Sequence, residues 1–289
     1  MTASYRPPLP QRHVLITGCS SGIGHECAWI LRRRGYPVIA SARHEDDVQR
    51  LREEGFTCVR LDLCDDESIA AALEEVDTLS GERLYALFNN GAYGQPGAVE
   101  DLTREVLRRQ FETNVFGTHE LTRRVIARMR RQGYGRIIFN SSVLGFVAMP
   151  FRGAYNASKF ALEGLADTLR LELHGSGITV SLIEPGPIRS RFRRNALRAF
   201  EQHIDYRHSV FAETYERVLK RLRQSSDSPV FTLGPEAVGK KLIHALESRH
   251  PRIRYPVTFP THLFHILRRC LPDTTLDRLL RQAGRAENR

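Results

Sequence analysis

Cysteine is scarce in this chain of 289 residues, and the five cysteines are odd in number. No C-x-x-C pair occurs among them, so the sequence argues against a secreted disulfide scaffold and against a structural zinc site. We therefore expect a reducing compartment, the cytoplasm. The cysteines are Cys19, Cys27, Cys58, Cys64 and Cys270.

Long apolar runs are also missing. No stretch of 18 or more apolar residues occurs, which excludes a membrane-spanning helix on hydropathy grounds. The first twelve residues, MTASYRPPLPQR, lack the apolar core of a signal peptide. These two absences lead us to expect a soluble protein.

Lysine is scarce too, because only 4 of the 43 basic residues are lysines. Residues 1–188 carry 22 basic and 23 acidic side chains, whereas residues 189–289 carry 21 and 10. The net charge of +10 therefore lies entirely in the last third. Such a surface fits a solvated or interface face, an anionic membrane or substrate, or a nucleic acid. Since no nucleic-acid-binding motif accompanies it, we expect no nucleic-acid partner.

What the sequence does contain is an alternation of short apolar runs and longer amphipathic stretches. This alternation predicts βαβ units with right-handed crossovers around a parallel sheet. The expected fold class is therefore α/β, with a parallel sheet. The predicted strands are 13–17, 36–42, 58–61, 84–89, 135–140, 179–183 and 253–257, and the predicted helices are 23–34, 46–54, 66–79, 104–131 (one or two helices), 154–174 and 235–248.

The pattern changes after Pro185. Residues 187–230 are rich in arginine, contain scattered aromatic residues and end in the turn-like sequence SSDSP. We interpret them as a helical lid inserted into an α/β domain of residues 12–257. The amphipathic stretch 261–281 predicts a C-terminal extension over residues 258–289.

The most specific local motif joins the first predicted strand to the first predicted helix. It reads Thr17-Gly18-Cys19-Ser20-Ser21-Gly22-Ile23-Gly24. Its glycines allow a tight turn and a close approach to a pyrophosphate, which a helix N-terminus attracts. The place between strand and helix makes the motif far more specific than a bare glycine triplet. The alternative is a glycine-rich turn that binds nothing.

Arg43 is the residue that indicates which dinucleotide is bound. It ends the segment Ser41-Ala42-Arg43, where an NAD site usually has a carboxylate. An arginine at this place accommodates the 2′-phosphate of NADP and can form charge-assisted hydrogen bonds with it. The sequence therefore predicts NADP(H) as the cofactor, with an ordinary surface arginine as the alternative.

A serine, a tyrosine and a lysine form the candidate catalytic group. Tyr155 and Lys159 are four residues apart in a predicted helix, so both side chains face the same side. Ser142 follows the fifth predicted strand, and ligands bind at the carboxyl ends of strands in such sheets. A Tyr-x-x-x-Lys pair alone is commonly structural, but the glycine turn upstream favours a catalytic role.

Together these motifs resemble the short-chain dehydrogenase/reductase family, over about residues 12–188 and more loosely to 257. The segments TGCSSGIG and RYPVT look like the retinol- and hydroxysteroid-dehydrogenase-like branch, which includes bacterial NADP-dependent aldehyde reductases. The resemblance implies a single doubly wound Rossmann domain with a seven-stranded parallel sheet, an NAD(P) cofactor and a homo-oligomer. It is carried by Thr17–Gly24, Asn114, Ser142, Tyr155, Lys159 and residues 184–188 (EPGPI).

The resemblance also implies a role for each matching residue. Tyr155 would be the acid/base, Ser142 would polarise the carbonyl, Lys159 would bind the nicotinamide ribose and lower the tyrosine pKa, and Asn114 would hold the water of a proton relay. The implied cofactor contacts are Gly18, Ser20, Ser21, Gly22, Ile23 and Gly24, then Arg43, then Asp62 and Leu63 at the adenine, Asn90 and Gly91 at the adenosine ribose, Tyr155 and Lys159, and Pro185, Gly186 and Ile188 at the nicotinamide.

One motif departs from the family pattern. The usual NNAG is here Asn89-Asn90-Gly91-Ala92, which moves the residue without a Cβ by one position. The proposed chemistry is physically reasonable, because a tyrosine with an ordinary pKa near 10 needs a shift of about 3 units to act as a base at neutral pH. A nearby ammonium group favours the phenolate and supplies part of that shift.

Several residues leave alternatives open. His262 and His265 are either metal ligands or ordinary core or surface histidines, and we expect no metal. Cys19 is either a reactive thiol or a packing residue. The aromatic side chains of the lid either line an apolar pocket or pack among themselves, and the tail either lies on a membrane surface or packs against protein. The residues in question are Phe192, Phe200, Phe211 and Tyr215, with Tyr93, Phe146 and Met149, and the tail segment 264–269.

The sequence as a whole predicts an oxidoreductase that transfers hydride between NADP(H) and a carbonyl or alcohol. The expected substrate is an apolar aldehyde of retinoid-like or steroid-like type. The alternative is a non-enzymatic NADP-binding sensor or scaffold. Loss of the serine, tyrosine or lysine would mark that alternative, and all three are present.

Overall fold

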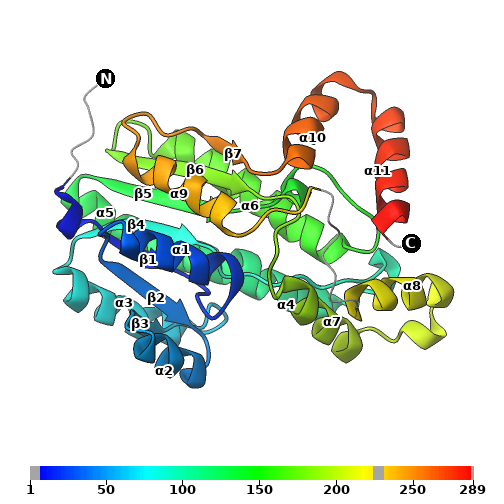
Figure 1. Cartoon of the computed structure of the whole chain (residues 1–289), viewed down its shortest axis with the longest axis horizontal. Coiled ribbons are helices and arrows are strands. Elements are labelled where there is room, and N and C mark those ends of the chain that lie inside the picture. Colours follow the sequence, from blue (N-terminus) through cyan, green and yellow to red (C-terminus); the bar gives the residue numbers. More distant parts are fainter. Residues whose placement is uncertain (1–6, 224–230, 288–289) are drawn as a thin grey trace.

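The computed structural model describes residues 7–223 and 231–287. In these residues seven parallel strands form one sheet in the order β3-β2-β1-β4-β5-β6-β7 (Figure 1). The sequence prediction of a seven-stranded parallel sheet is therefore confirmed. The strands are β1 His13–Ile16, β2 Val38–Ala42, β3 Thr57–Arg60, β4 Leu84–Asn89, β5 Gly135–Asn140, β6 Ile178–Glu184 and β7 Arg254–Pro256.

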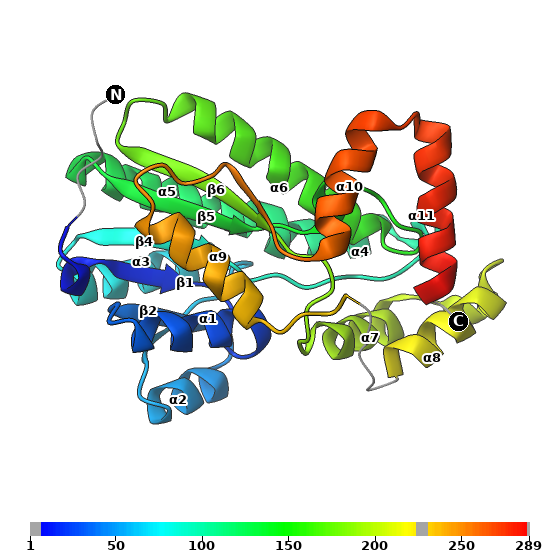
Figure 2. The ribbon, with the colours of Figure 1, turned by 45° about the horizontal axis from the view of Figure 1, so that its top comes forward.

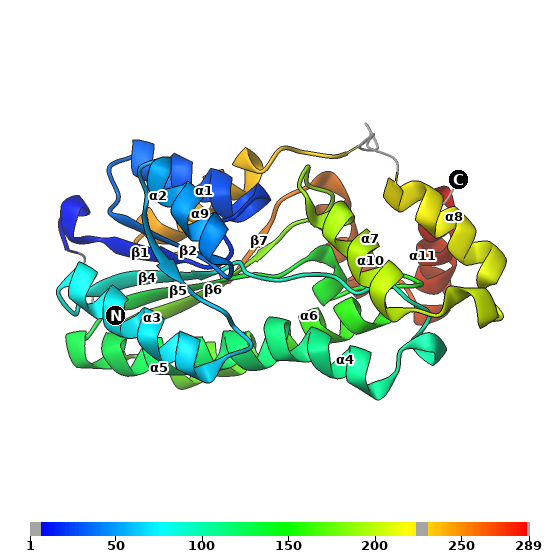
Figure 3. The ribbon, with the colours of Figure 1, turned by 90° about the horizontal axis from the view of Figure 1, so that it is seen from below.

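Helices cover both faces of this sheet, which explains why its strands are apolar on both sides. Figure 3 shows α1, α2 and α9 on one face and α3, α5 and α6 on the other. The helices are α1 Gly22–Arg33, α2 Glu45–Glu53, α3 Asp66–Ser80, α4 Arg104–Phe111, α5 Thr118–Gln132, α6 Gly153–Glu172, α7 Phe192–His203, α8 Ala212–Arg223, α9 Glu236–Glu247, α10 Phe259–Cys270 and α11 Asp273–Glu287, with short 3₁₀ turns at Leu9–Gln11, Val99–Asp101, Val143–Gly145 and Tyr206–His208.

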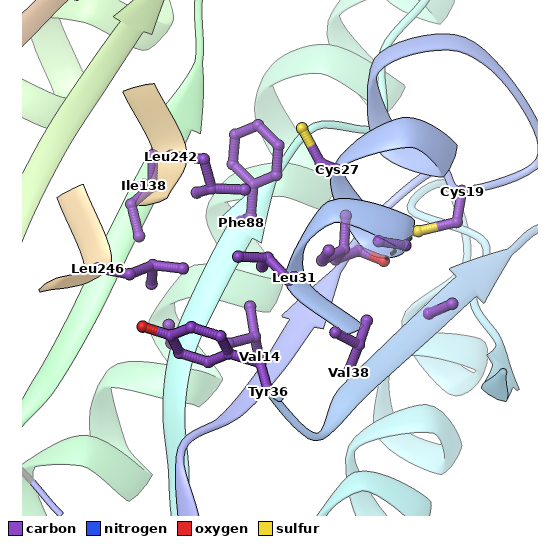
Figure 4. Close-up of a cluster of buried hydrophobic side chains, with 14 of the residues drawn as sticks. Val14, Cys19, Cys27, Leu31, Tyr36, Val38, Phe88, Ile138, Leu242 and Leu246 are labelled. Atoms are coloured by element: carbon purple, nitrogen blue, oxygen red, sulfur yellow. Dashed lines mark hydrogen bonds between the residues drawn. The ribbon is translucent and has the colours of Figure 1, made fainter. Parts of the chain in front are cut away.

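The core between the sheet and the first helix layer is built from residues far apart in sequence. Val14 and Phe88 on the strands pack against Leu31 of α1 and Leu242 of α9 (Figure 4). All four side chains are fully buried. A second apolar cluster fills the other face under α3, α5 and α6. This packing fixes the strand ends that carry the site.

The predicted helix 104–131 is two α-helices with a π-helical turn between them. The π turn spans Glu112–Gly117 and joins α4 to α5 without a loop. Gly117 permits this arrangement, because a side chain there would collide with the backbone carbonyl of Leu63. Such π turns are frequently found at functional sites.

Four helices gather beyond the carboxyl ends of the strands. Figures 1 and 2 show α7, α8, α10 and α11 at this end of the sheet. The amphipathic stretch 261–281 lies in two helices, α10 and α11, which are separated at Leu271 and Pro272. The break has a physical reason, because the residue before a proline avoids the helical region, and Leu271 is extended.

The SSDSP segment, residues 225–229, lies outside the described residues. Among the residues that are described, no helix has both the length and the apolar character needed to span a membrane.

Candidate active site

The sheet reverses its winding direction between β1 and β4, and this is where the site lies. β1 has β2 on one side and β4 on the other, so the two connections leave in opposite directions and open a crevice at the carboxyl ends. The predicted site residues that follow β1, β2, β3, β4, β5 and β6 all reach this end of the sheet. The structure thus brings together residues separated by up to 170 positions, from Gly18 to Ile188.

The glycine turn after β1 forms a cradle for an anionic group. Gly18 has a φ of +69°, and a Cβ there would lie 2.9 Å from the Cα of Gly91. Ser21 caps α1 with its backbone only, since no side chain bonds to the first-turn amides. These amides and the helix dipole suit a pyrophosphate. The motif residues fit a dinucleotide on this ground.

The end of β4 is tied directly to this turn. The Thr17 hydroxyl accepts hydrogen bonds from the backbone N–H groups of Asn90, at 2.8 Å, and Gly91, at 2.7 Å. Asn90 Nδ2 donates to the Thr17 carbonyl at 2.9 Å. A Cβ at Gly91 would lie 3.2 Å from both Thr17 Oγ1 and Leu63 Cδ1, so the departure from NNAG relieves a tight contact with these two side chains.

Arg43, Asp62 and Leu63 border the outer end of the crevice. Arg43 is exposed directly after β2, and its guanidinium donates to His44 Nε2 at 3.0 and 3.2 Å. Asp62 and Leu63 follow β3, where Asp62 Oδ1 accepts from the N–H of Cys64 at 3.0 Å. The acidic residues after Arg43 begin α2, as the sequence predicted. A guanidinium is thus the charged group closest to the end of β2.

Ser142, Tyr155 and Lys159 meet at the carboxyl end of β5. The Ser142 side chain lies close enough to Tyr155 to lower the pKa of its phenol, and Lys159 Nζ lies 5.7 Å from the centroid of the Tyr155 ring. Lys159 Nζ also donates to the Asn140 carbonyl at 2.7 Å. The one-turn spacing on α6 therefore places acid, ammonium and hydroxyl in one group.

Burial opposes charge on both ionisable members of this group. It raises the pKa of Tyr155 to about 12, against a lowering effect of the Ser142 hydrogen bond. It also lowers the pKa of Lys159 to about 8, against the raising effect of the Glu163 carboxylate. The tyrosine is accordingly held as a proton donor and the lysine as a cation whose charge depends on its neighbours.

Asn114 lies in the π-helical turn and holds the loop after β4. Its Oδ1 accepts from the N–H of Tyr93 at 3.2 Å, and its Nδ2 donates to the Tyr93 carbonyl at 3.0 Å. The same Nδ2 also lies 3.1 Å from the hydroxyl of Ser158 on α6. Asn114 thereby connects the loop after β4 to the helix that carries Tyr155 and Lys159.

The segment after β6 closes the crevice on the side of Ser142. The N–H of Val143 donates to the Pro185 carbonyl at 2.8 Å, which places Pro185 and Gly186 beside the Ser142 loop. Ile188 pairs with Leu233 and begins the path into α7. Of the three predicted nicotinamide contacts, Pro185 therefore lies beside Ser142, whereas Gly186 lies against Thr258 and Ile188 packs against the core cluster of α1 and α9.

Some aromatic residues of the lid pack among themselves, and one of them faces the site. Phe200 and Tyr215 are fully buried and pack with Phe211 and Phe151, so they form a core within the lid. Phe192 instead points toward the site. Its ring meets Tyr155 edge-on with 5.3 Å between centroids, and it lies against Gly94.

Phe146 and Met149 border the site on the side of α10 and α11. Phe146 packs in a cluster with Val147, Phe264 and Leu280. Met149 lies near Gly284 of α11. Apolar side chains therefore lie against Tyr155, through Phe192, and in the turn that follows Ser142, through Phe146.

The alternative for Cys19 is decided by burial. Cys19 is fully buried, and burial raises the pKa of its thiol to about 12, so the interpretation as a reactive thiol is wrong. In the described part of the chain no three side chains form a group suited to a metal ion.

His265 is the residue whose connection the sequence did not indicate. Its Nε2 lies 2.6 Å from Oε2 of the buried Glu184. The two residues are 81 positions apart, and no local motif relates them.

Comparison with known proteins agrees with this geometry. The chain matches the family model described as short chain dehydrogenase over residues 12–200. It is 44% identical to the uncharacterized oxidoreductase YbbO of Escherichia coli over 278 residues, which cover 93% of this chain and 94% of that protein. It is 31% identical to retinol dehydrogenase 8 of Bos taurus, with coverage of 84% and 80%. It is 30% identical to the NADPH-dependent 3-dehydrocapnine reductase of Ornithobacterium rhinotracheale, with coverage of 93% and 95%. The chain therefore belongs to the short-chain dehydrogenase/reductase family of oxidoreductases.

Proposed function

We propose that this protein is an NADP(H)-dependent carbonyl reductase and alcohol dehydrogenase acting on apolar aldehydes of retinoid-like or steroid-like type. The observation that carries the proposal is the meeting of Ser142, Tyr155 and Lys159 beside the glycine turn at one crevice. Bound NADPH would supply the hydride to the carbonyl carbon.

In the reductive direction Tyr155 and Ser142 act on the carbonyl oxygen. The Ser142 hydroxyl donates a hydrogen bond to this oxygen and stabilises the negative charge that develops there. Tyr155 then transfers its phenolic proton to the same oxygen. The raised pKa of Tyr155 fits this role, because the hydroxyl keeps its proton until the oxygen becomes basic.

Lys159 and Asn114 support the proton transfer. The ammonium group of Lys159 stabilises the phenolate left on Tyr155, and it is fixed by the Asn140 carbonyl. Asn114 holds Tyr93 and Ser158 in place and is proposed to bind the water through which the proton on Tyr155 is restored. Lys159 would in addition bind the nicotinamide ribose.

Arg43 is proposed to select NADP(H) over NAD(H). It stands exposed at the end of β2, where the adenosine ribose would lie, and carboxylates enter only in α2. The name of the NADPH-dependent bacterial relative is consistent with this choice. Gly18, Gly22 and Gly24 would accommodate the pyrophosphate, with Asp62 and Leu63 at the adenine and Asn90 and Gly91 at its ribose.

The apolar surroundings support an apolar substrate. Phe192 lies on one side of Tyr155, and Phe146 and Met149 lie on the side of the C-terminal helices. A long hydrocarbon bound between them would leave water, whereas a charged substrate would lose hydration without compensation. The retinol dehydrogenase among the relatives acts, by its name, on such a molecule.

For its setting we propose a cytoplasmic homo-oligomer without a nucleic-acid partner. All five cysteines are free thiols, which supports a reducing compartment. The exposed Phe259 and Ile266 on α10, next to Arg268 and Arg269, support a weak contact of this helix with a membrane surface.

The deciding experiment follows NADPH and NADH consumption at 340 nm with medium-chain aliphatic aldehydes, retinal and steroid ketones. We expect turnover with NADPH well above NADH, and fastest with the apolar aldehydes. Tight NADPH binding with no consumption of the cofactor on any carbonyl would instead favour a non-enzymatic NADP sensor or scaffold.

A further inference from the structure

A buried cluster of charged side chains lies one helical turn beyond Lys159. Glu163 follows Lys159 by four residues on α6, and Glu184 is the last residue of β6. Both side chains are buried, Glu184 completely. Arg254 of β7 joins them, with Nη2 at 3.0 Å from Glu163 Oε2 and Nε at 3.2 Å from Glu184 Oε1. One guanidinium is therefore shared by two buried carboxylates.

Asp167 is a third carboxylate that pairs with the guanidinium of Arg254. Its Oδ2 lies 2.6 Å from Arg254 Nη2, and its Oδ1 lies 3.4 Å from Arg170. The charged groups around Glu163 are thus Lys159, Asp167 and Arg170 on α6, Glu184 on β6, Arg254 on β7 and His265 on α10. A buried carboxylate without its partner is strongly unfavourable, so the distribution of these contacts decides which groups stay charged.

His265 enters this cluster from the C-terminal helices. Its Nε2 lies 2.6 Å from Glu184 Oε2, the carboxylate oxygen that Arg254 does not contact. The flat face of the imidazole ring stacks on the ring of Phe146, with 3.9 Å between centroids and 23° between planes. Phe146 directly follows the turn that begins at Ser142. His265 of α10 therefore contacts the buried Glu184 carboxylate on one side and the loop that follows Ser142 on the other.

We infer that His265 is a positioning residue for the active site, whose hydrogen bond to Glu184 leaves Arg254 free to pair with Glu163 and so keeps a carboxylate charge beside Lys159. Its stacking contact at the same time holds Phe146 against the substrate side. The inference rests on the proposed function, because it concerns the charge of the proposed catalytic lysine.

The charges of the cluster explain how the contact between His265 and Glu184 affects Lys159. The pKa of Glu163 is raised to about 7, because burial and the Glu184 carboxylate raise it more than Ser141 and Arg254 lower it. Without His265, Glu184 pairs more closely with Arg254. Arg254 then lowers the pKa of Glu163 less, so Glu163 takes up a proton at higher pH. A neutral Glu163 no longer favours the ammonium form of Lys159, which the proton transfer from Tyr155 requires.

Two substitutions separate the two contacts of His265. His265→Phe keeps a ring on Phe146 but removes the donor to Glu184. His265→Gln keeps a donor but removes the ring. We expect His265→Phe to move the alkaline limb of the kcat profile down by roughly one pH unit, because a protonated Glu163 no longer raises the pKa of Lys159 and the ammonium form is lost at lower pH. We expect His265→Gln to keep the wild-type limb and to raise KM for the carbonyl substrate several-fold.

His262→Ala is the matched control, because His262 is exposed on the same helix. It should leave both the pH profile and KM unchanged. Thermal unfolding and NADPH binding of each variant show whether the fold is kept. Alkaline limbs of His265→Phe and wild type that coincide would overturn the inference, as would an equal shift in His262→Ala.

A second measurement separates this inference from the proposed function. If wild-type protein reduces no carbonyl, the proposed function fails, but the pKa of Glu163 can still be followed by NMR of protein carrying ¹³C-labelled glutamate. Glu163→Gln identifies its resonance. A higher Glu163 pKa in His265→Phe than in wild type supports the contact network, and an unchanged pKa contradicts it.

Discussion

The two ends of this chain reach the same crevice in different ways. The part from β1 to β6 carries nearly balanced charge, and its site residues follow strands in local motifs such as Gly18–Gly24. The last third carries the excess positive charge and contributes helices that cover the site. Its important contacts, such as His265 with Glu184, join residues far apart in sequence. The first part therefore determines which chemistry is available, and the second part determines its surroundings.

The largest expected effect lies in the first part. Tyr155→Phe removes the only proton donor of the proposed mechanism while keeping the ring that packs on Phe192. We expect kcat to fall by about 10²–10⁴-fold, the range for loss of a general acid. NADPH binding, measured by fluorescence, should stay within about twofold, because the phenol is not part of the pyrophosphate cradle. Near-wild-type turnover would rule out the mechanism.

Core packing distinguishes the two regions in stability. Leu242→Ala opens a cavity between α9 and the sheet, where Leu242 is fully buried, and should lower the free energy of unfolding by about 2–5 kcal/mol. Leu280→Ala lies in the small cluster of α11 and should cost no more than about 2 kcal/mol, at the low end of such substitutions. Urea titration of both variants measures the difference.

Turnover measurements on the same two variants sharpen the comparison between the core and the C-terminal helices. Leu280→Ala should raise KM for an apolar aldehyde, because its cluster includes Phe146 beside the site. Leu242→Ala should leave KM unchanged at temperatures where the protein is folded. Equal stability losses in the two variants would mean that α10 and α11 belong to the same cooperative core as the sheet.

Cofactor selection is expected to show an intermediate effect. Arg43→Ala removes the guanidinium from the end of β2, and we expect KM for NADPH to rise about tenfold while KM for NADH changes little. Arg83→Ala, an exposed arginine at the amino end of β4, is the control and should change neither value. An equal rise for both cofactors in Arg43→Ala would contradict selection by the 2′-phosphate.

The smallest effect concerns paired charge on the surface of the first part. Arg123 and Arg124 bond to Glu120 on α5 and lower its pKa to about 2. A depressed folded-state pKa adds stability above the unfolded pKa, near 4.5, and this stability is lost as the pH falls toward 2. Glu120→Gln should cost less than about 1 kcal/mol at pH 7, because exposed pairs are screened. Urea titrations at pH 7 and pH 3 should show the difference shrinking, and a constant difference would exclude the ion pairs as its cause.

Most elements of the fold could be predicted because their signals are local. The apolar segments 84–89 and 135–140 coincide with β4 and β5, and Asp65 caps α3 by accepting from the N–H groups of Glu67 and Ser68. Some strands begin or end at other residues than predicted, because a residue there cannot pair with the neighbouring strand. β2 begins at Val38 and not at Tyr36, since Pro37 between them has no N–H to donate.

The sequence by itself determined the parallel sheet, the glycine cradle and the one-turn spacing of Tyr155 and Lys159. These follow from periodicity and spacing, which local backbone geometry converts directly into position. Only the tertiary structure decided that Phe192 faces Tyr155 while Phe200 and Tyr215 are buried in the lid, that Cys19 is inert, and that His265 meets Glu184. Burial and long-range pairing depend on how α7 to α11 pack over the crevice, and no short stretch of sequence contains that information.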